Sequence, residues 1–461
     1  MLSPPALERV LRFHQWQRRC TLAICAGVLA GATSPLLAQT APLPLPTEMK
    51  DSDSAASGWK AALPTWLKLS FVTDFRASAI DRKSTLLVPK NLGLQEAKMT
   101  GFAKTVVNAD ATFGALRASV QWRGMAGTQD GHDASIGSLD EAYLEYGFTP
   151  TVLGFAGRRN LAFGKAYSVS PLDVFLSRQP LDRSLNVDSR RKEVKGIDSV
   201  GVNAFFDNYS VLALFAPGIY GLNGGSEDRA LLKLDAVFPK IDSDATLLLY
   251  WGHNPRVGLG FSKTIGQSLV VYMEDTLQRG NDVKAITALD FGAPGRFVSS
   301  EARHGAFNRF TGGIGYTFES GIGVNLEYIN DQTGFSRKQW ATISQLAQTN
   351  SALLGQSVYQ RLGQGNLLTL NGLMRNETVR QNYGFFRAVQ DKVLFDTARL
   401  EFTHLQSLDD GSGVSSVRFE NNFTPSLTGG IFASHSFGNS HSEFGMRTGH
   451  FRLVGYVTSR F

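Results

Sequence analysis

The chain has 461 residues, of which 43% are hydrophobic, 46 are Lys or Arg and 40 are Asp or Glu. A net charge of only +6 gives no basis for nucleic-acid binding, so no nucleic-acid partner is expected. Both cysteines, Cys20 and Cys25, lie close to the N-terminus, which excludes disulfides from the rest of the chain.

Residues 1–38 have the pattern of a cleaved export signal. Residues 20–37 are apolar, but the run is shorter than the roughly 20 residues of a spanning helix and Pro35 interrupts it. We expect Sec-dependent export and cleavage after Ala38. Removal of this segment leaves 42 basic and 39 acidic residues. The basic residues ahead of the apolar run are Arg9, Arg12, Arg18 and Arg19.

Alternating apolar and polar residues begin after a Pro-, Ala- and Ser-rich stretch, 39–63, which is expected to be a periplasmic lead-in. In 67–78 the odd positions are mostly apolar and the even positions mostly polar. The same division recurs at 116–123 and 140–148, and again later in the chain. Segments of about ten residues with this period match tilted strands that cross a bilayer.

Connections between these segments alternate between short and long. Tight turns are expected near 149–150, 265–266 and 320–321, and long loops at 164–195 and 331–378. The pattern predicts an all-β fold, a transmembrane antiparallel β-barrel over residues 64–461. It should have about 18 strands (16 to 18), short periplasmic turns and long extracellular loops.

Charged side chains on the inward face of the predicted strands are candidates for the pore lining. The long loop 164–195 is rich in arginine, and we expect it to fold inward and constrict the pore; a solvated outside loop is the alternative. Basic groups in a narrow passage favour anionic or sugar-like solutes, although inward glutamates reduce that preference. The candidates are Arg76, Arg117, Arg123, Arg158, Glu141 and Glu145 in strands, and Arg178, Arg183, Arg190 and Arg191 in the loop.

The second long loop, 331–378, carries apolar residues at helical spacing, including Phe335, Trp340, Ile343 and Leu346. This spacing predicts one or two amphipathic helices. Such helices either plug the pore or pack on the barrel rim.

The sequence contains no pattern typical of an enzyme. The histidines are scattered, with no pair at metal-ligand helical spacing, and the glycines at 221–225 lack the Lys of a phosphate-binding loop. We therefore expect a protein that is not an enzyme and has neither a metal nor a cofactor.

The last strand, 450–461, alternates in the same way and ends on Phe461. It resembles the closing strand of Gram-negative outer-membrane β-barrels, whose terminal Phe is read by the barrel-assembly machinery. The resemblance implies an outer-membrane location and contact with outer-membrane lipid and lipopolysaccharide. The loop 164–195 is similar in position to the pore loop of general porins, and 157–173 resembles a motif of alginate-export barrels.

These observations favour a monomeric, substrate-selective porin for passive diffusion of small polar solutes, with anions preferred. A trimer is the alternative assembly. The sequence is also compatible with two alternative functions: export of an acidic polysaccharide, and a plugged structural or adhesive surface barrel.

Overall fold

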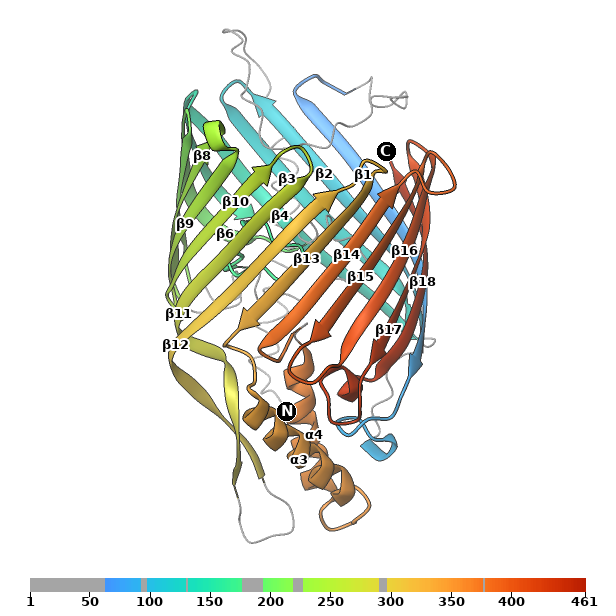
Figure 1. Ribbon diagram of the computed structural model, residues 1–461. Helices are drawn as coiled ribbons and strands as arrows, with labels where there is room; N and C mark the ends of the chain where they lie inside the picture. Colours follow the sequence, from blue (N-terminus) through green and yellow to red (C-terminus); the bar gives the residue numbers. More distant parts are fainter. Residues whose placement is uncertain are drawn as a thin grey trace, which may run out of the picture. The chain divides into compact units, whose positions relative to one another are not determined.

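The computed structural model describes residues 63–92, 98–129, 132–175, 194–218, 227–289, 297–375 and 378–461. These residues form one sheet of 18 antiparallel strands in which each strand pairs with its neighbours in sequence (Figure 1). Pairing of the first strand with the last closes the sheet, so no edge is left unpaired. The predicted all-β barrel of 18 strands is confirmed.

The strands are β1 (Leu67–Arg82), β2 (Met99–Phe113), β3 (Leu116–Gln129), β4 (His132–Thr149), β5 (Val152–Arg159), β6 (Ile197–Phe206), β7 (Tyr209–Ala216), β8 (Arg229–Phe238), β9 (Ser243–Trp251), β10 (Arg256–Ile265), β11 (Leu269–Leu289), β12 (Phe297–Thr317), β13 (Ile322–Asp331), β14 (Asn382–Asp391), β15 (Ala398–Ser407), β16 (Gly413–Thr424), β17 (Leu427–Phe437) and β18 (Gly449–Arg460).

Strand β13 shows how the period of two divides the barrel wall. Leu326 and Tyr328 are 52% and 45% exposed and point outward, whereas Glu327 between them is 2% exposed and points into the barrel. An apolar outer face and a polar lumen are what a membrane-spanning barrel requires, because only the outer face meets lipid.

The two ends of the barrel differ in their connections. At the short-turn end, Gly114 and Gly321 have φ of 58° and 83°, a left-handed conformation that glycine adopts most easily. This end also carries the seam between the first and last strands, where the backbone N–H of Phe461 donates to the carbonyl of Phe71 at 2.9 Å. The opposite end, the long-loop end, carries the connections 160–196 and 332–381.

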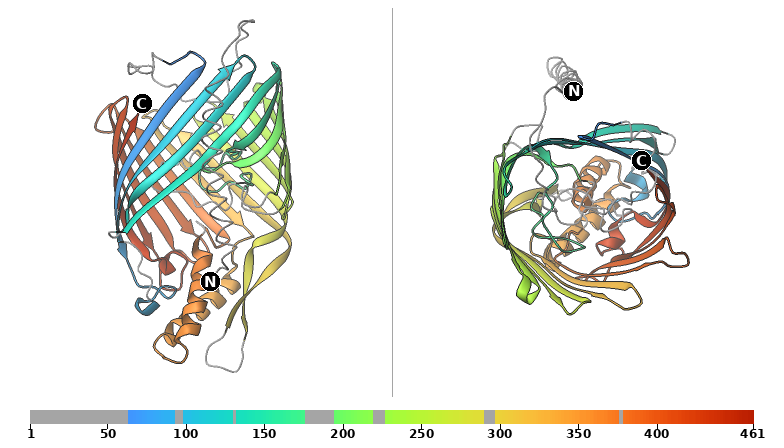
Figure 2. Two further views of the ribbon diagram at one scale, coloured as in Figure 1. Left: turned by 180° about the vertical axis from the view of Figure 1, so that it is seen from behind. Right: turned by 90° about the horizontal axis from the view of Figure 1, so that it is seen from above.

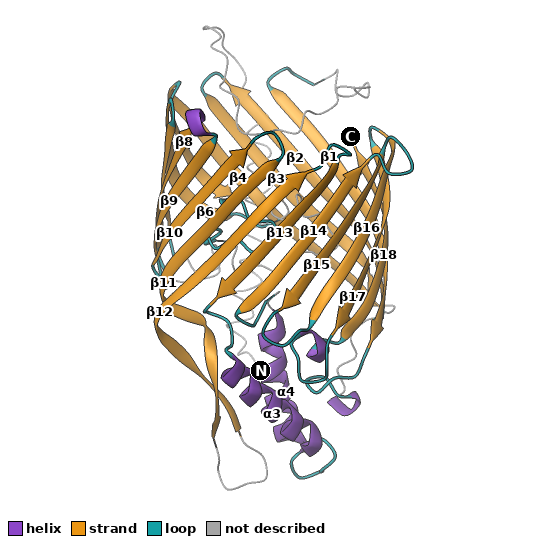
Figure 3. Ribbon diagram, viewed as in Figure 1, coloured by secondary structure: helices purple, strands orange, loops and turns teal. Residues whose placement is uncertain are grey.

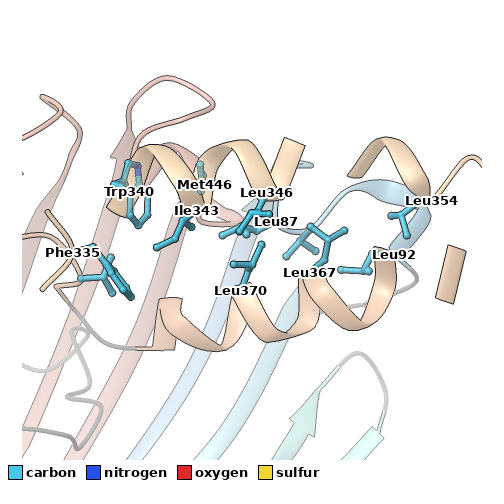
Figure 4. Close-up of a cluster of buried hydrophobic side chains, with 13 residues drawn as sticks. Leu87, Leu92, Phe335, Trp340, Ile343, Leu346, Leu354, Leu367, Leu370 and Met446 are labelled. Atoms are coloured by element: carbon cyan, nitrogen blue, oxygen red, sulfur yellow. The ribbon is translucent and has the colours of Figure 1, made fainter. Parts of the chain in front are cut away.

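Two helices, α3 (Arg337–Leu353) and α4 (Gln360–Gly372), lie at the long-loop end (Figure 3). Ser336 and Gln339 form a capping box at the start of α3. The apolar faces of both helices bury a core with residues of the β1–β2 and β17–β18 connections (Figure 4). No helix among the described residues is long and apolar enough to cross a membrane.

Candidate functional site

The first part of the β5–β6 connection, residues 160–175, enters the barrel and is here called the inward segment. In the view from above it lies inside the ring of strands (Figure 2). One side of the segment is apolar and packs against β5 to β9. This cluster contains Leu161, Leu172, Val174 and Phe175 of the segment with Phe155, Ile197, Leu214, Leu231, Leu248 and Tyr250 of the wall.

A buried carboxylate of β11 holds the other side of the inward segment. Glu274 is fully buried and accepts hydrogen bonds from the backbone N–H groups of Lys165 and Ala166, the latter at 2.9 Å. It also accepts from the hydroxyl of Ser170. Three donors on one carboxylate satisfy a charge that would otherwise be costly to bury.

Glu327 of β13 likewise accepts hydrogen bonds from the next two backbone N–H groups of the inward segment, those of Tyr167 and Ser168. Its Oε1 accepts from the backbone N–H of Tyr167 at 2.6 Å, and its Oε2 from that of Ser168 at 2.9 Å. The Tyr272 hydroxyl donates to the same carboxylate at 2.6 Å. Four consecutive backbone N–H groups, 165 to 168, are therefore fixed by two carboxylates on opposite sides of β12.

Asp173 folds the inward segment back on itself. Its Oδ1 accepts from the backbone N–H groups of Phe163 and Gly164 at 2.6 and 2.8 Å. The carbonyl of Val169 accepts from Thr311 of β12 at 2.8 Å. The segment is thus both internally closed and bonded to the wall.

A second set of inward side chains forms a continuous charged row, here called the charged wall, across β14, β15, β16, β18, β1 and β2. Its members are Arg387, Glu401, Arg418, Glu420, Tyr456, Arg76, Asp74 and Lys104.

Glu401 joins the first part of the charged wall, with its oxygens 2.6 Å from Arg387 Nε and 3.5 Å from Arg418 Nε. The Tyr456 hydroxyl donates to Glu420 at 2.6 Å. On the far side of Tyr456, the guanidinium carbon of Arg76 lies 5.6 Å from the centre of its ring.

Asp74 joins the last two cations of the row, 2.5 Å from Arg76 Nη2 and 3.5 Å from Lys104 Nζ. At the other end of the wall, the Arg387 guanidinium lies 5.0 Å from the ring centre of Tyr167 in the inward segment. The two features of the lumen therefore meet at this contact.

The predicted site residues fall into separate groups. Arg76 belongs to the charged wall. Arg117 lies 2.9 Å from Asp110 and is in register with Glu145, which accepts from Arg159 at 3.3 Å. These residues form a second charged cluster, on β2 to β5.

The remaining strand candidates have other partners. Arg123 pairs with Asp140 at 2.9 Å, and Glu141 accepts from the backbone N–H of Asn160 at 2.7 Å. Arg158 is buried and forms a two-point pair with Asp198. The loop candidates Arg178, Arg183, Arg190 and Arg191 lie outside the described residues.

Sequence reasoning missed Glu274, Arg387, Arg418 and Lys104 as site residues. The alternation of strand residues could have identified these four residues, because each lies next to outward-facing residues. Glu274, for example, follows Met273, which is 50% exposed. Within the described chain no group of three or more His, Cys, Asp or Glu side chains is arranged to hold a metal ion.

No protein-family model matches the sequence, and no curated protein shows significant similarity to it. Among solved structures, OccK11 of Pseudomonas aeruginosa matches with a TM-score of 0.51 at 9% identity, over 86% of this chain and 96% of that one. OccAB3 of Acinetobacter baumannii gives 0.48 at 10% identity, over 86% and 99%. A mutant porin of Rh. blastica gives 0.40 at 10% identity, over 86% and 100%. At such identities the likeness concerns the fold, which is that of outer-membrane porin barrels.

Proposed function

We propose that this chain is an outer-membrane channel, active as a single barrel, through which small polar solutes diffuse passively with a preference for anions. The observation that carries the proposal is the inward segment, which two buried carboxylates fix inside the barrel. A barrel of 18 strands is too wide for its strand side chains to fill, so an inserted segment determines the bore. Solutes then pass along the charged wall.

The composition of the charged wall supports a modest preference for anions. It contains four cations, Arg387, Arg418, Arg76 and Lys104, against the three carboxylates Glu401, Glu420 and Asp74. Charges in a narrow passage interact more strongly than in bulk water, so a surplus of one cation affects permeation. Small carboxylates and sugar acids are the solutes that fit this chemistry.

Planar-bilayer recording of the refolded protein tests this function. Reversal potentials under a salt gradient should show anion preference, which should weaken in Arg387→Gln and strengthen in Glu420→Gln. The two variants remove opposite charges from one wall, so each is the control for the other. A folded barrel that never conducts would contradict the proposal and favour a plugged or structural barrel.

We further propose that the whole loop 164–195 narrows the pore. Its arginines then add to the positive potential of the passage, and Arg190→Glu with Arg191→Glu should reduce or reverse the anion preference. An unchanged reversal potential would show that this part of the loop lies away from the ion path.

Phe461 is proposed as the assembly signal. Its backbone pairs with Phe71 at the seam, while its side chain is 50% exposed. Deletion of Phe461 should impair insertion into the outer membrane but leave export across the inner membrane intact. Fractionation of cells that express the truncated chain distinguishes the two steps, and normal barrel assembly would contradict the assignment.

A further inference from the structure

A groove of about 940 Å³ lies at the long-loop end, between the β9–β10 turn and the β11–β12 hairpin. Figure 1 shows this hairpin continuing well beyond the other strands. The groove lies apart from the charged wall.

The groove forms because the β11–β12 hairpin bends where it leaves the barrel. The β11–β12 register breaks between Arg279 and Asn281, and again between Asn281 and Ala285. Gly280 and Gly305 have φ of 84° and 123°, which side-chain-bearing residues rarely adopt. A Cβ on Gly280 would also lie 2.3 Å from Asn254 Oδ1, so both the backbone and the space favour glycine there.

The part of the groove nearer the membrane is apolar. Trp251, Val257 and Leu277 line it and are 51%, 49% and 55% exposed. They lie on the outward face of β9, β10 and β11, at the ends of these strands where an aromatic belt meets the bilayer interface. A hydrocarbon chain would cover this exposed surface.

The part farther from the membrane is basic. Arg279 and His304 are exposed lining residues on the two strands of the bent hairpin. Arg303 donates to the carbonyls of Thr333 and Gly334 at 2.6 and 3.2 Å, so it fixes the hairpin. None of the groove's described lining residues is acidic, although the lining His253 lies 3.0 Å from the carboxylate of Glu227. Arg279 and Arg303 give the lining a positive charge, which attracts anions.

We propose that this groove binds one phosphate-bearing lipid of the outer leaflet. An acyl chain lies on Trp251 and Leu277, and the phosphate accepts hydrogen bonds from Arg279 and His304. The order along the outer face, apolar and then basic, matches the order of chain and headgroup in a leaflet. The proposal rests on the long-loop end facing outside, but it does not depend on conduction through the lumen.

Native mass spectrometry of the detergent-solubilised barrel tests the proposal with dioleoyl phosphatidic acid and dioleoylglycerol, which share their chains and differ in the phosphate. We expect one phosphatidic acid to be retained per barrel, with dioleoylglycerol bound far more weakly. Arg279→Gln should weaken retention by about five-fold, because a cation near an anionic headgroup contributes about that much. His304→Gln should weaken it less, through the loss of one hydrogen bond to the phosphate. Lys83→Gln, an exposed cation of the β1–β2 connection at the same end of the barrel, is the matched control and should have no effect.

Equal retention of the two lipids, or normal retention in Arg279→Gln and His304→Gln, would overturn the site. A second readout is quenching of tryptophan fluorescence by phosphatidic acid with brominated chains, which Trp251→Phe should largely remove. Quenching that persists in Trp251→Phe would place the chain elsewhere. A barrel that binds the lipid yet does not conduct would refute the proposed channel and leave the lipid site standing.

Discussion

The inward segment and the helical cap both belong to long connections at the same end of the barrel, but different interactions hold them. The cap consists of α3, α4, residues 85–92 and Met446, and it buries an apolar core of its own. The polar side of the inward segment is held instead by the carboxylates Glu274 and Glu327.

The difference follows from the surface that each connection meets. Inside the barrel, the inward faces of β11 and β13 present carboxylates, and a chain that covers them must donate hydrogen bonds or leave a charge unsatisfied. The cap lies beyond the barrel mouth, and its buried Leu and Ile residues stabilise it by packing. The attachment of the inward segment to β11 and β13 should therefore depend on charge, and the stability of the cap on packing.

The largest expected effect comes from Glu274→Gln combined with Glu327→Gln. Each amide replaces one acceptor oxygen with a donor that faces an N–H or O–H group, and hydrogen bonds to charged groups contribute about 1.5–3 kcal/mol each. We expect the polar side of the inward segment, residues 165–168, to detach from β11 and β13. Bilayer recording should then show a larger conductance with weaker ion selectivity.

Glu319→Gln is the control for that double variant, because Glu319 is exposed in the β12–β13 turn. Its conductance should equal that of the wild type. If the double variant also kept the wild-type conductance and selectivity, the segment would not define the bore.

A smaller effect, confined to the cap, is expected for Leu367→Ala. Leu367 is fully buried in the cap core, and truncation of a buried Leu typically costs about 2–5 kcal/mol. Leu368→Ala is the matched control on the same helix, since Leu368 is 49% exposed. Hydrogen exchange in α3 and α4 should accelerate only in the Leu367 variant, with the strands unchanged; equal exchange in both variants would contradict an apolar cap.

The smallest effect concerns pH. Glu443, in the β17–β18 connection, is fully buried, and this burial raises its pKa although Arg447 Nη2 donates to it at 3.0 Å. A carboxyl with a raised pKa binds its proton more tightly when folded, so this contribution stabilises the loop most at low pH. It should decline as pH rises from about 4.3, the ordinary value for Glu, through the raised pKa.

Hydrogen exchange of residues 438–448, corrected for intrinsic rates, should follow that decline. Glu443→Gln removes the titration, so its protection should be nearly flat over the same pH range. A wild-type profile as flat as that of the variant would contradict a titrating Glu443.

Much of the barrel was predictable because strand alternation is a local property. The assignment of Glu327 to the lumen needs only its neighbours Leu326 and Tyr328. The partners of a charged residue were not predictable in this way. Glu274 accepts a hydrogen bond from the backbone N–H of Lys165, which is 109 positions away in the chain.

The sequence by itself predicted the closed barrel, a strand number of about 18 and the faces of the alternating strand residues, because successive strand residues point to opposite sides, one toward lipid and one toward water. Only the tertiary structure decided which carboxylates meet the inward segment, that Arg76 and Arg418 share the ring of Tyr456, and where the β11–β12 hairpin bends. These features depend on register and on contacts between distant segments. A local sequence pattern does not predict such contacts, because each inward side chain has many possible partners of the right charge.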